Sequence, residues 1–146
     1  MSIHKIYSDK EKGKLLHIIH TISSDAPERI DIVPAEEFLQ LSCLRLNKSK
    51  EFEAHEHVYK PGEETVIAQE SWVVIRGKIR FFAFDLDGTL LQEIDLNCGD
   101  CSITLYGGHN YKILEDDTMV YEYKTGPYKG QKMDKRFINR GEKWKK

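Results

Sequence analysis

The sequence is dominated by short apolar segments separated by turn signals, and this alternation constrains the fold more than any other feature. The segments are rich in β-branched and aromatic residues, and helical periodicity is poor nearly everywhere. This pattern is typical of an all-β sandwich or barrel. Residues 33–38 predict one short helical turn, because proline and glutamate suit a first turn. Strands are expected at 15–22, 38–46, 53–59, 72–75, 78–84, 90–96, 102–106, 111–114 and 119–124.

Length and composition place these strands in one domain. The chain has 146 residues, which suits a single hydrophobic core. Its formal net charge of −2 argues against a protein that coats nucleic acid electrostatically. No apolar run is long enough for a membrane span, and the N-terminus lacks the apolar region of a signal peptide. Three cysteines argue against a disulfide framework, so we expect a cytoplasmic protein with no nucleic-acid or membrane partner.

Two short motifs suggest chemistry that their context does not support. Residues 81–91, FFAFDLDGTLL, resemble the first motif of haloacid-dehalogenase-like phosphatases, in which Asp85 and Asp87 would be the catalytic pair. That chemistry needs helices between parallel strands, whereas the following residues indicate strands, so we interpret the Asp-Leu-Asp-Gly segment as a hairpin turn. Cys98 and Cys101 have the spacing of a zinc half-site or redox pair, but no second such pair occurs, and core packing is their expected role.

A stronger pattern begins at His55 and His57, which flank Glu56 in a predicted strand. Residues two apart on a strand point to the same face, so both imidazoles can reach one metal ion while Glu56 points away. This pair of histidines alone is weak evidence for a metal site. Further along, the chain has an E-x6-G pattern that ends at Gly77, and then the segment 107–109, Gly-Gly-His.

Together these motifs resemble the metal signature of the cupin superfamily. The resemblance implies an all-β, single-domain cupin, a double-stranded β-helix or jelly-roll barrel, with a short N-terminal extension. It also implies that one divalent metal ion is bound by His55, His57, Glu70 and His109. Three imidazoles and one carboxylate suit Fe, Mn, Ni, Co or Zn.

The spacing departs from the common cupin form. Twelve residues separate His57 from Glu70, and residues 60–65 are interpreted as an inserted loop. Glu63 or Glu64 in that loop are therefore alternatives to Glu70 as the carboxylate ligand.

Residues 122–130 and 134–137 sharpen the resemblance, because they are similar to small bacterial cupins, some of them found among genes for surface-polysaccharide biosynthesis. On a strand, Glu122 and Lys124 share one face, which is either directed into the barrel or solvated. With Tyr128 they are the candidate catalytic proton carriers.

Two classes of function remain open at this stage. The protein is either a metal-dependent enzyme or a non-catalytic module that binds a small-molecule ligand, sugar-like or carboxylate. For an enzyme, a sugar isomerase or epimerase and an iron-dependent dioxygenase both suit a metal with open coordination positions. The residues do not decide between catalysis and binding.

Three regions are expected along the chain. Residues 1–40 form an N-terminal extension with a strand and a short helical turn, 41–128 form the barrel, and 129–146 form a basic C-terminal tail. The tail has eight basic residues against Asp134 and Glu142, and is either a solvated end or a site for a polyanion. The resemblance implies a homodimer in which the extension covers or exchanges a sheet edge.

Overall fold

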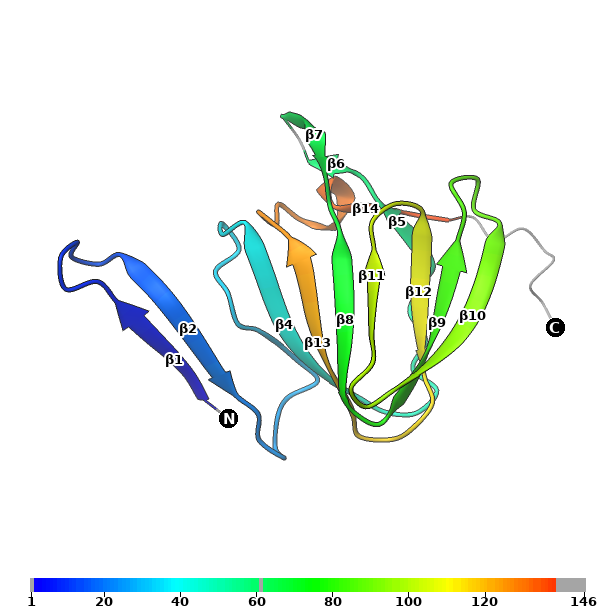
Figure 1. Ribbon diagram of the computed structural model, residues 1–146, viewed down its shortest axis with the longest axis horizontal. Coiled ribbons are helices and arrows are strands. Elements are labelled where there is room, and N and C mark those ends of the chain that lie inside the picture. The colour runs from blue at the N-terminus through cyan, green and yellow to red at the C-terminus, as the bar shows by residue number, and fades with distance from the viewer. Residues whose placement is uncertain (1, 61, 139–146) are drawn as a thin grey trace.

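The computed structural model describes residues 2–60 and 62–138, which form two five-stranded antiparallel sheets that face each other (Figure 1). The first sheet has the order β10-β9-β12-β5-β14, with bounds Leu90–Asn97, Lys78–Phe84, Gly108–Ile113, His55–His57 and Lys135–Phe137. The second has the order β11-β8-β13-β4-β3, with bounds Cys101–Thr104, Glu70–Arg76, Thr118–Thr125, Leu39–Leu46 and Arg29–Asp31. The chain passes repeatedly from one sheet to the other, as in a jelly roll.

Two small hairpins stand outside these sheets. One joins β1 (Ser2–Tyr7) to β2 (Leu15–Thr21), and the other joins β6 (Tyr59–Lys60) to β7 (Glu63–Ile67). A single 3-10 turn, η1 (Gln131–Met133), precedes β14. Within the described part of the chain, no helix is long and apolar enough to cross a lipid bilayer.

The apolar core fills the space between the two sheets at one end of the barrel. The rings of Trp72 and Tyr111 stack there with centroids 4.0 Å apart, and Tyr111 is held by a 2.9 Å hydrogen bond between its hydroxyl and that of Ser102. Both sheets contribute to this core, which consists of Leu44, Leu46, Trp72, Val74, Ile79, Tyr111, Ile113 and Val120.

Gly77 makes the tight connection between β8 and β9. Its φ is +80°, a conformation that side-chain-bearing residues rarely adopt, and a Cβ at this position would collide with Thr118. The glycine of the E-x6-G pattern therefore has a steric role: it permits the tight turn after β8, the strand whose first residue is Glu70.

The predicted all-β fold is confirmed, and each predicted strand range overlaps a strand. The segment interpreted as a hairpin turn does join β9 to β10, which pair antiparallel, and the Gly88 amide donates to the Asp85 carbonyl at 3.0 Å. Residues 33–38 form an irregular turn, not the short helical turn that was expected. The reason is local, because the Gln40 side chain donates to the carbonyls of Pro34 and Glu37 at 2.9 and 2.6 Å.

The two sheets extend beyond the range 41–128 that was expected for the barrel. β3 adds an edge strand to one sheet, and β14 adds an edge strand to the other. Within the expected tail, residues 129–138 thus include a strand of the barrel, whereas residues 139–146 lie outside the described residues.

Candidate metal centre

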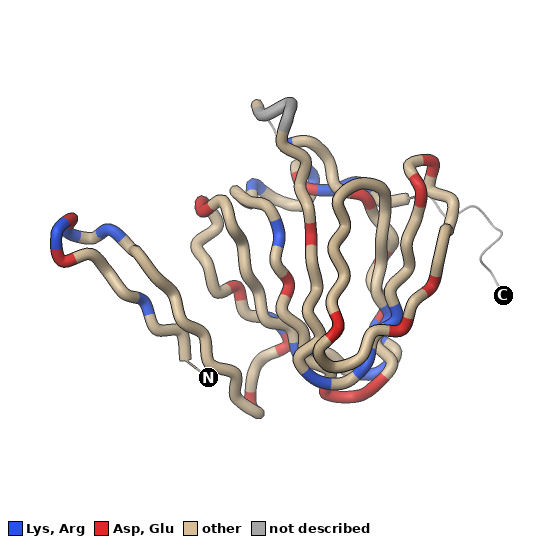
Figure 2. Tube along the Cα trace, in the orientation of Figure 1, with Lys and Arg blue, Asp and Glu red and all other residues tan. Residues whose placement is uncertain are grey.

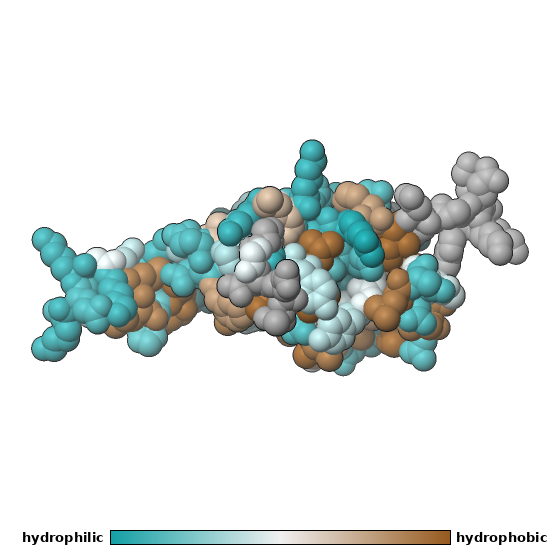
Figure 3. All heavy atoms as spheres, turned by 90° about the horizontal axis from the view of Figure 1, so that it is seen from above, coloured by the Kyte–Doolittle hydropathy of each residue, from teal (hydrophilic) through white to brown (hydrophobic). Residues whose placement is uncertain are grey.

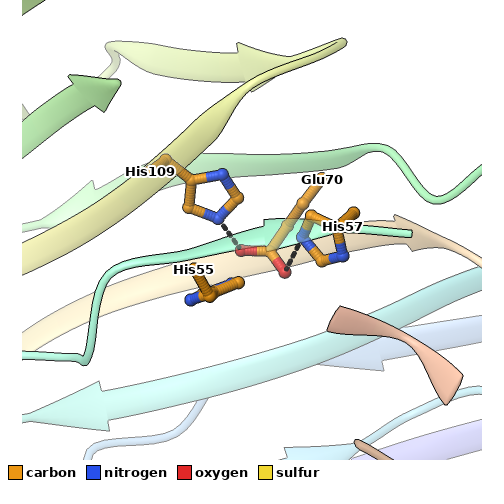
Figure 4. A group of neighbouring side chains, drawn as sticks. All are labelled: His55, His57, Glu70 and His109. Carbon is orange, nitrogen blue, oxygen red and sulfur yellow. Dashed lines mark hydrogen bonds and ion pairs between the residues drawn. The ribbon is translucent and has the colours of Figure 1, made fainter. Parts of the chain in front are cut away.

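Three strands bring His55, His57, Glu70 and His109 together inside the barrel (Figure 4). His55 on β5 is the direct pairing partner of His109 on β12, so the two side chains lie side by side on the same face of their sheet. His57 lies two residues further along β5, and Glu70 begins β8 in the opposite sheet. One potential ligand atom from each residue lies within 4.8 Å of all the others, and all four residues are buried.

The two histidines of β5 are oriented by hydrogen bonds to backbone carbonyls. Nδ1 of His55 donates to the Glu53 carbonyl at 2.9 Å, and Nδ1 of His57 donates to the Asp134 carbonyl at 3.3 Å. Each imidazole thus carries a proton on Nδ1, which leaves Nε2 as the atom that can bind a metal when it is deprotonated. Nε2 of His55 is buried with no hydrogen-bond partner among the described residues, whereas the buried Nε2 of His57 faces the Glu70 carboxylate at 3.4 Å.

An unpaired buried nitrogen such as Nε2 of His55 is unusual, because buried polar atoms normally have partners. A cation in the middle of the group would satisfy this nitrogen and would also bind Nε2 of His57 and the Glu70 carboxylate. The residues present therefore fit a bound metal, and the donor set of three imidazoles and one carboxylate suits a first-row transition metal.

Glu70 supplies the negative charge of the group. Its Oε1 lies 3.1 Å from Nε2 of His109, and its Oε2 lies 3.4 Å from Nε2 of His57. Burial alone would raise the pKa of this carboxyl, but hydrogen bonds and the charges of His109 and His57 hold it well below its usual range. Glu70 is thus an anionic ligand ready for a cation.

The two histidines of β5 titrate in opposite directions in the metal-free protein. Burial, together with the nearby charges of His109 and Lys135, lowers the pKa of His55 to about 3. Burial also acts against the charged form of His57, but the carboxylates of Asp134 and Glu70 outweigh it and raise the pKa of His57 to about 9. A proton on His57 therefore occupies the place that a metal cation would take.

Glu70 is thus the carboxylate that the structure brings to the group. The alternatives, Glu63 and Glu64, lie on β7 in the small hairpin, and their side chains lie outside the described part of the structure.

Asp134 and Lys60 form a buried ion pair against His57 that the sequence did not reveal. Nζ of Lys60 lies 2.8 Å from Oδ1 of Asp134, whose Oδ2 lies 3.5 Å from Nδ1 of His57. Burial would raise the pKa of Asp134, but hydrogen bonds with His57 and Lys60 lower it strongly. A pair 74 residues apart has no local pattern in the sequence, although Asp134 and Lys135, at the start of β14, belong to the segment that carries the family resemblance.

A cavity of about 300 Å³ adjoins the four-residue group. His55 and Glu70 form part of its wall, and Trp72 and Tyr111 border it on the side of the apolar core. The remaining polar lining comprises Arg29, Asp31, Gln40, Ser42, Glu122, Lys124, Tyr128, Gln131, Asp134 and Lys135. A wider hollow of about 750 Å³ lies nearby, but only His57 of the group borders it, so the smaller cavity is the better ligand site.

The three candidate proton carriers, Glu122, Lys124 and Tyr128, all line this cavity. Glu122 is buried and accepts hydrogen bonds from Arg29 at 2.9 Å and from Nε1 of Trp72 at 3.2 Å. Burial and the charge of Glu70 raise its pKa, partly offset by Arg29 and Lys124.

Lys124 and Tyr128 contact each other at the edge of the cavity. Nζ of Lys124 lies 4.3 Å from the centre of the Tyr128 ring and 3.9 Å from Oδ2 of Asp134. The side of β13 that carries Glu122 and Lys124 thus faces the barrel interior. Its other side is also covered, since Met119 and Tyr121 pack in a second cluster with Cys43.

No protein-family model matches the sequence, and no curated protein sequence matches it. Solved structures do match. An uncharacterized conserved protein with a double-stranded β-helix domain from Klebsiella pneumoniae is 16% identical over 84% of this chain and 99% of that chain, with a TM-score of 0.56. KdgF from Halomonas sp. is 18% identical over 75% of this chain and 88% of that one, with a TM-score of 0.52.

CapF, a capsular polysaccharide assembling protein from Staphylococcus aureus, is 12% identical, with a TM-score of 0.62. The match covers 94% of this chain but only 34% of CapF, so the chain corresponds to about a third of that protein. At these levels of identity the similarity shows the fold alone.

Proposed function

We propose that this protein, which has the cupin fold, binds one divalent transition-metal ion at His55, His57, Glu70 and His109 and holds a small polar ligand in the adjacent cavity. The observation that carries the proposal is the buried, unpartnered Nε2 of His55, which lies in one group with Nε2 of His57 and an ionised carboxylate. We expect Fe, Mn, Ni, Co or Zn at this position.

Charge at the cavity favours a ligand that carries a carboxylate as well as hydroxyl groups. Lys135 lines the cavity without an ion-pair partner among the described residues, and Lys124 shares Asp134 with Lys60, which is closer. A bound divalent ion would add positive charge at the inner wall. An acidic sugar or a small hydroxy acid is therefore the expected ligand class.

For catalysis, we propose an isomerase or epimerase reaction on such a ligand. The metal, when bound, supplies Lewis-acid polarisation of a ligand oxygen. Glu122, whose raised pKa suits it to hold a proton, then acts as acid or base, and Lys124 and Tyr128 orient the ligand or relay the proton. The similarity in fold to CapF, a capsular polysaccharide assembling protein, supports surface-polysaccharide biosynthesis as the setting.

A non-catalytic binding module is the second candidate. It is favoured by the pairing of Glu122 with Arg29 and Trp72, which fixes the carboxylate in place and reduces its freedom to exchange a proton. An iron-dependent dioxygenase is the third candidate function. Oxygen consumption by iron-loaded protein would distinguish it from the isomerase and from the binding module. We also propose a cytoplasmic location, in accordance with three free cysteines.

Metal analysis of protein purified without an affinity tag tests the metal site. We expect about one transition-metal ion per chain, and loss of that ion in the double variant His55→Ala, His57→Ala. His17→Ala, which changes an exposed histidine outside the barrel, is the matched control and should keep the metal. A wild type that neither contains nor takes up metal would refute the site.

Titration calorimetry with a uronic acid and the matching neutral sugar tests the ligand class. Metal-loaded wild type should bind the acid more tightly, and Lys124→Met should weaken binding of the acid more than that of the neutral sugar. Equal binding of both sugars would contradict the carboxylate assignment without affecting the metal site.

A further inference from the structure

β3 brings Arg29 and Asp31 into the cavity beside the metal-site group, although this strand belongs to the expected N-terminal extension. It pairs with β4 at the edge of its sheet, and Ile30 packs on the cluster that contains Cys43 and Met119. Because side chains alternate between the two faces of a strand, Arg29 and Asp31 point the other way, and both line the cavity. The extension therefore contributes to the site, and the sequence pattern does not single out Arg29.

Arg29 links three polar side chains of this sheet. Its Nε donates to Oδ1 of Asp31 at 2.9 Å, and its Nη2 donates to Oγ of Ser42 at 2.7 Å and to Oε1 of Glu122 at 2.9 Å. Oγ of Ser42 in turn donates to Oδ1 of Asp31 at 2.7 Å. Partial burial acts against the charged form of Arg29, but the charges and hydrogen bonds of Glu122 and Asp31 outweigh it and raise its pKa. The guanidinium is thus a charged group that is fixed in place.

Glu122 is held at both oxygens of its carboxylate. Oε1 accepts a hydrogen bond from Arg29, and Oε2 accepts one from Nε1 of Trp72 at 3.2 Å. The strand register explains this arrangement, because it places Glu122 between Trp72 on β8 and Ser42 on β4. An ionised carboxylate has about four acceptor positions, so these two hydrogen bonds leave others vacant. Since Glu122 lines the cavity, a ligand there can use them.

Arg29 is the cation that determines where the Glu122 carboxylate lies. β13 carries both Glu122 and Lys124 on its inward side, and both signs of charge mark this strand in Figure 2. Lys124, however, contacts Asp134 and the ring of Tyr128. Among the described residues, Arg29 is therefore the cation that forms a salt bridge with Glu122.

The rest of the cavity wall combines aromatic rings with polar groups. Trp72 and Tyr128 supply rings, and Gln131 of η1 supplies an amide. Figure 3 looks onto the end of the barrel that carries η1, and polar and apolar atoms lie side by side there. A hydrocarbon ring with hydroxyl groups fits such a wall, because its faces pack on aromatic rings while its hydroxyl groups form hydrogen bonds. Neighbouring hydroxyl groups can donate to the two oxygens of one carboxylate.

We propose that Arg29 is a positioning residue, which holds Glu122 against Trp72 so that the Glu122 carboxylate accepts hydrogen bonds from neighbouring hydroxyl groups of a sugar-like ligand. This inference rests on the proposed function, since it places the ligand in the same cavity. A hydrogen bond from a ligand hydroxyl is also the contact that a general base needs before it removes a proton. β3 thereby becomes part of ligand recognition.

Fluorescence of Trp72 tests the positioning role in the ligand-free, full-length chain. Trp144→Phe leaves Trp72 as the sole tryptophan and is the background for every variant. Arg29→Gln should change the emission of Trp72, because the carboxylate beside the indole is no longer held. Arg29→Lys should rescue the emission only in part, since one ammonium group does not reproduce the planar guanidinium.

Two further variants complete the fluorescence experiment. Ser42→Ala removes one support of Arg29 without changing charge, and should give a smaller change in the same direction. Arg136→Gln is the matched control, because Arg136 is exposed and pairs with Glu56 outside this cavity, and it should leave the emission unchanged.

Titration calorimetry of the metal-loaded chain tests the hydroxyl contact. The probes are a uronic acid and its deoxy analogues, each of which lacks one ring hydroxyl group. Wild type should bind the complete acid about tenfold more tightly than at least one analogue, because that analogue leaves a buried acceptor unpaired. Arg29→Gln and Glu122→Gln should reduce this preference, whereas Arg136→Gln should keep it.

The two measurements separate this inference from the proposed function. Unchanged Trp72 emission in Arg29→Gln overturns the positioning role, whatever the ligand is. A wild type that binds every analogue as tightly as the complete acid overturns the hydroxyl contact. A wild type that binds none of the probes refutes the ligand class as well, and the fluorescence still decides the role of Arg29. Metal content is the folding control, because a variant that keeps its metal has a native barrel.

Discussion

The two ends of the barrel are built from the same strands, yet one end is filled with hydrocarbon and the other with charge. β13 places Val120 at the apolar end and Glu122 at the polar end, and β8 likewise places Val74 at one and Glu70 at the other. Both ends are buried. Strand geometry therefore determines which positions face inward, and the residue types alone determine whether those positions form a core or a site.

The difference has an energetic consequence. At the apolar end each side chain contributes to the stability of the fold by removing its own surface from water. At the polar end buried charges depend on their neighbours, because an unpaired buried charge is strongly unfavourable. We therefore expect truncation at the apolar end to lower the free energy of unfolding equally under all conditions. The contribution of the polar end to that free energy should instead depend on metal and pH.

Ile79→Ala should give the largest effect, because Ile79 is fully buried in the apolar core. We expect the free energy of unfolding to fall by about 2–5 kcal/mol. Urea denaturation should find the same loss with metal and with a chelator. A loss that changes with metal would show that the two ends are energetically coupled.

The pH dependence of the metal-free protein should be the next largest effect. The pKa of His57 is raised from 6.5 to about 9, so its proton stabilises the fold fully below about pH 6.5, and this contribution is lost as the pH rises towards 9. The pKa of His55 is lowered to about 3, so stability also falls as the pH drops below 6.5. Urea denaturation in a chelator should show a maximum near pH 6.5.

His57→Gln provides the control for that profile. It should flatten the alkaline side, whereas Ile79→Ala should shift the whole curve downward without changing its shape. An unchanged alkaline side in His57→Gln would assign the titration to another group.

Metal binding should stabilise the polar end selectively. At a free metal concentration about 100 times Kd, the wild type should gain about 2.7 kcal/mol. The double variant His55→Ala, His57→Ala should gain nothing, and Ile79→Ala should gain as much as the wild type. Thermal denaturation over a series of metal concentrations measures these gains.

Tyr111→Phe should give the smallest effect, at the boundary between the two ends. The substitution keeps the ring stacked on Trp72 but leaves the Ser102 hydroxyl without its partner, which lowers stability by about 1 kcal/mol. Ser102→Ala in the same chain should restore much of the loss. A double variant less stable than either single variant would contradict this explanation.

Nine of the strands could be predicted from the sequence because their signals are local, whereas Glu70 and His109 were proposed as metal ligands only through the family resemblance. Alternating apolar residues mark strands, and the spacing of His55 and His57 places both on one face. The contacts that orient these groups are not local. Asp134 lies 77 residues from His57, and Arg29 lies 93 residues from Glu122, so only the assembled sheets reveal either pair.

The pairing of β14 with β5 also determines when the site can be completed during synthesis. The chain emerges with its N-terminus first, so β5 is made long before Asp134 and the strand that follows it. Until residues 134–137 have left the ribosome, His57 lacks both its carbonyl acceptor and the neighbouring carboxylate. The surroundings of the candidate metal site are therefore complete only well after β5 itself has been made.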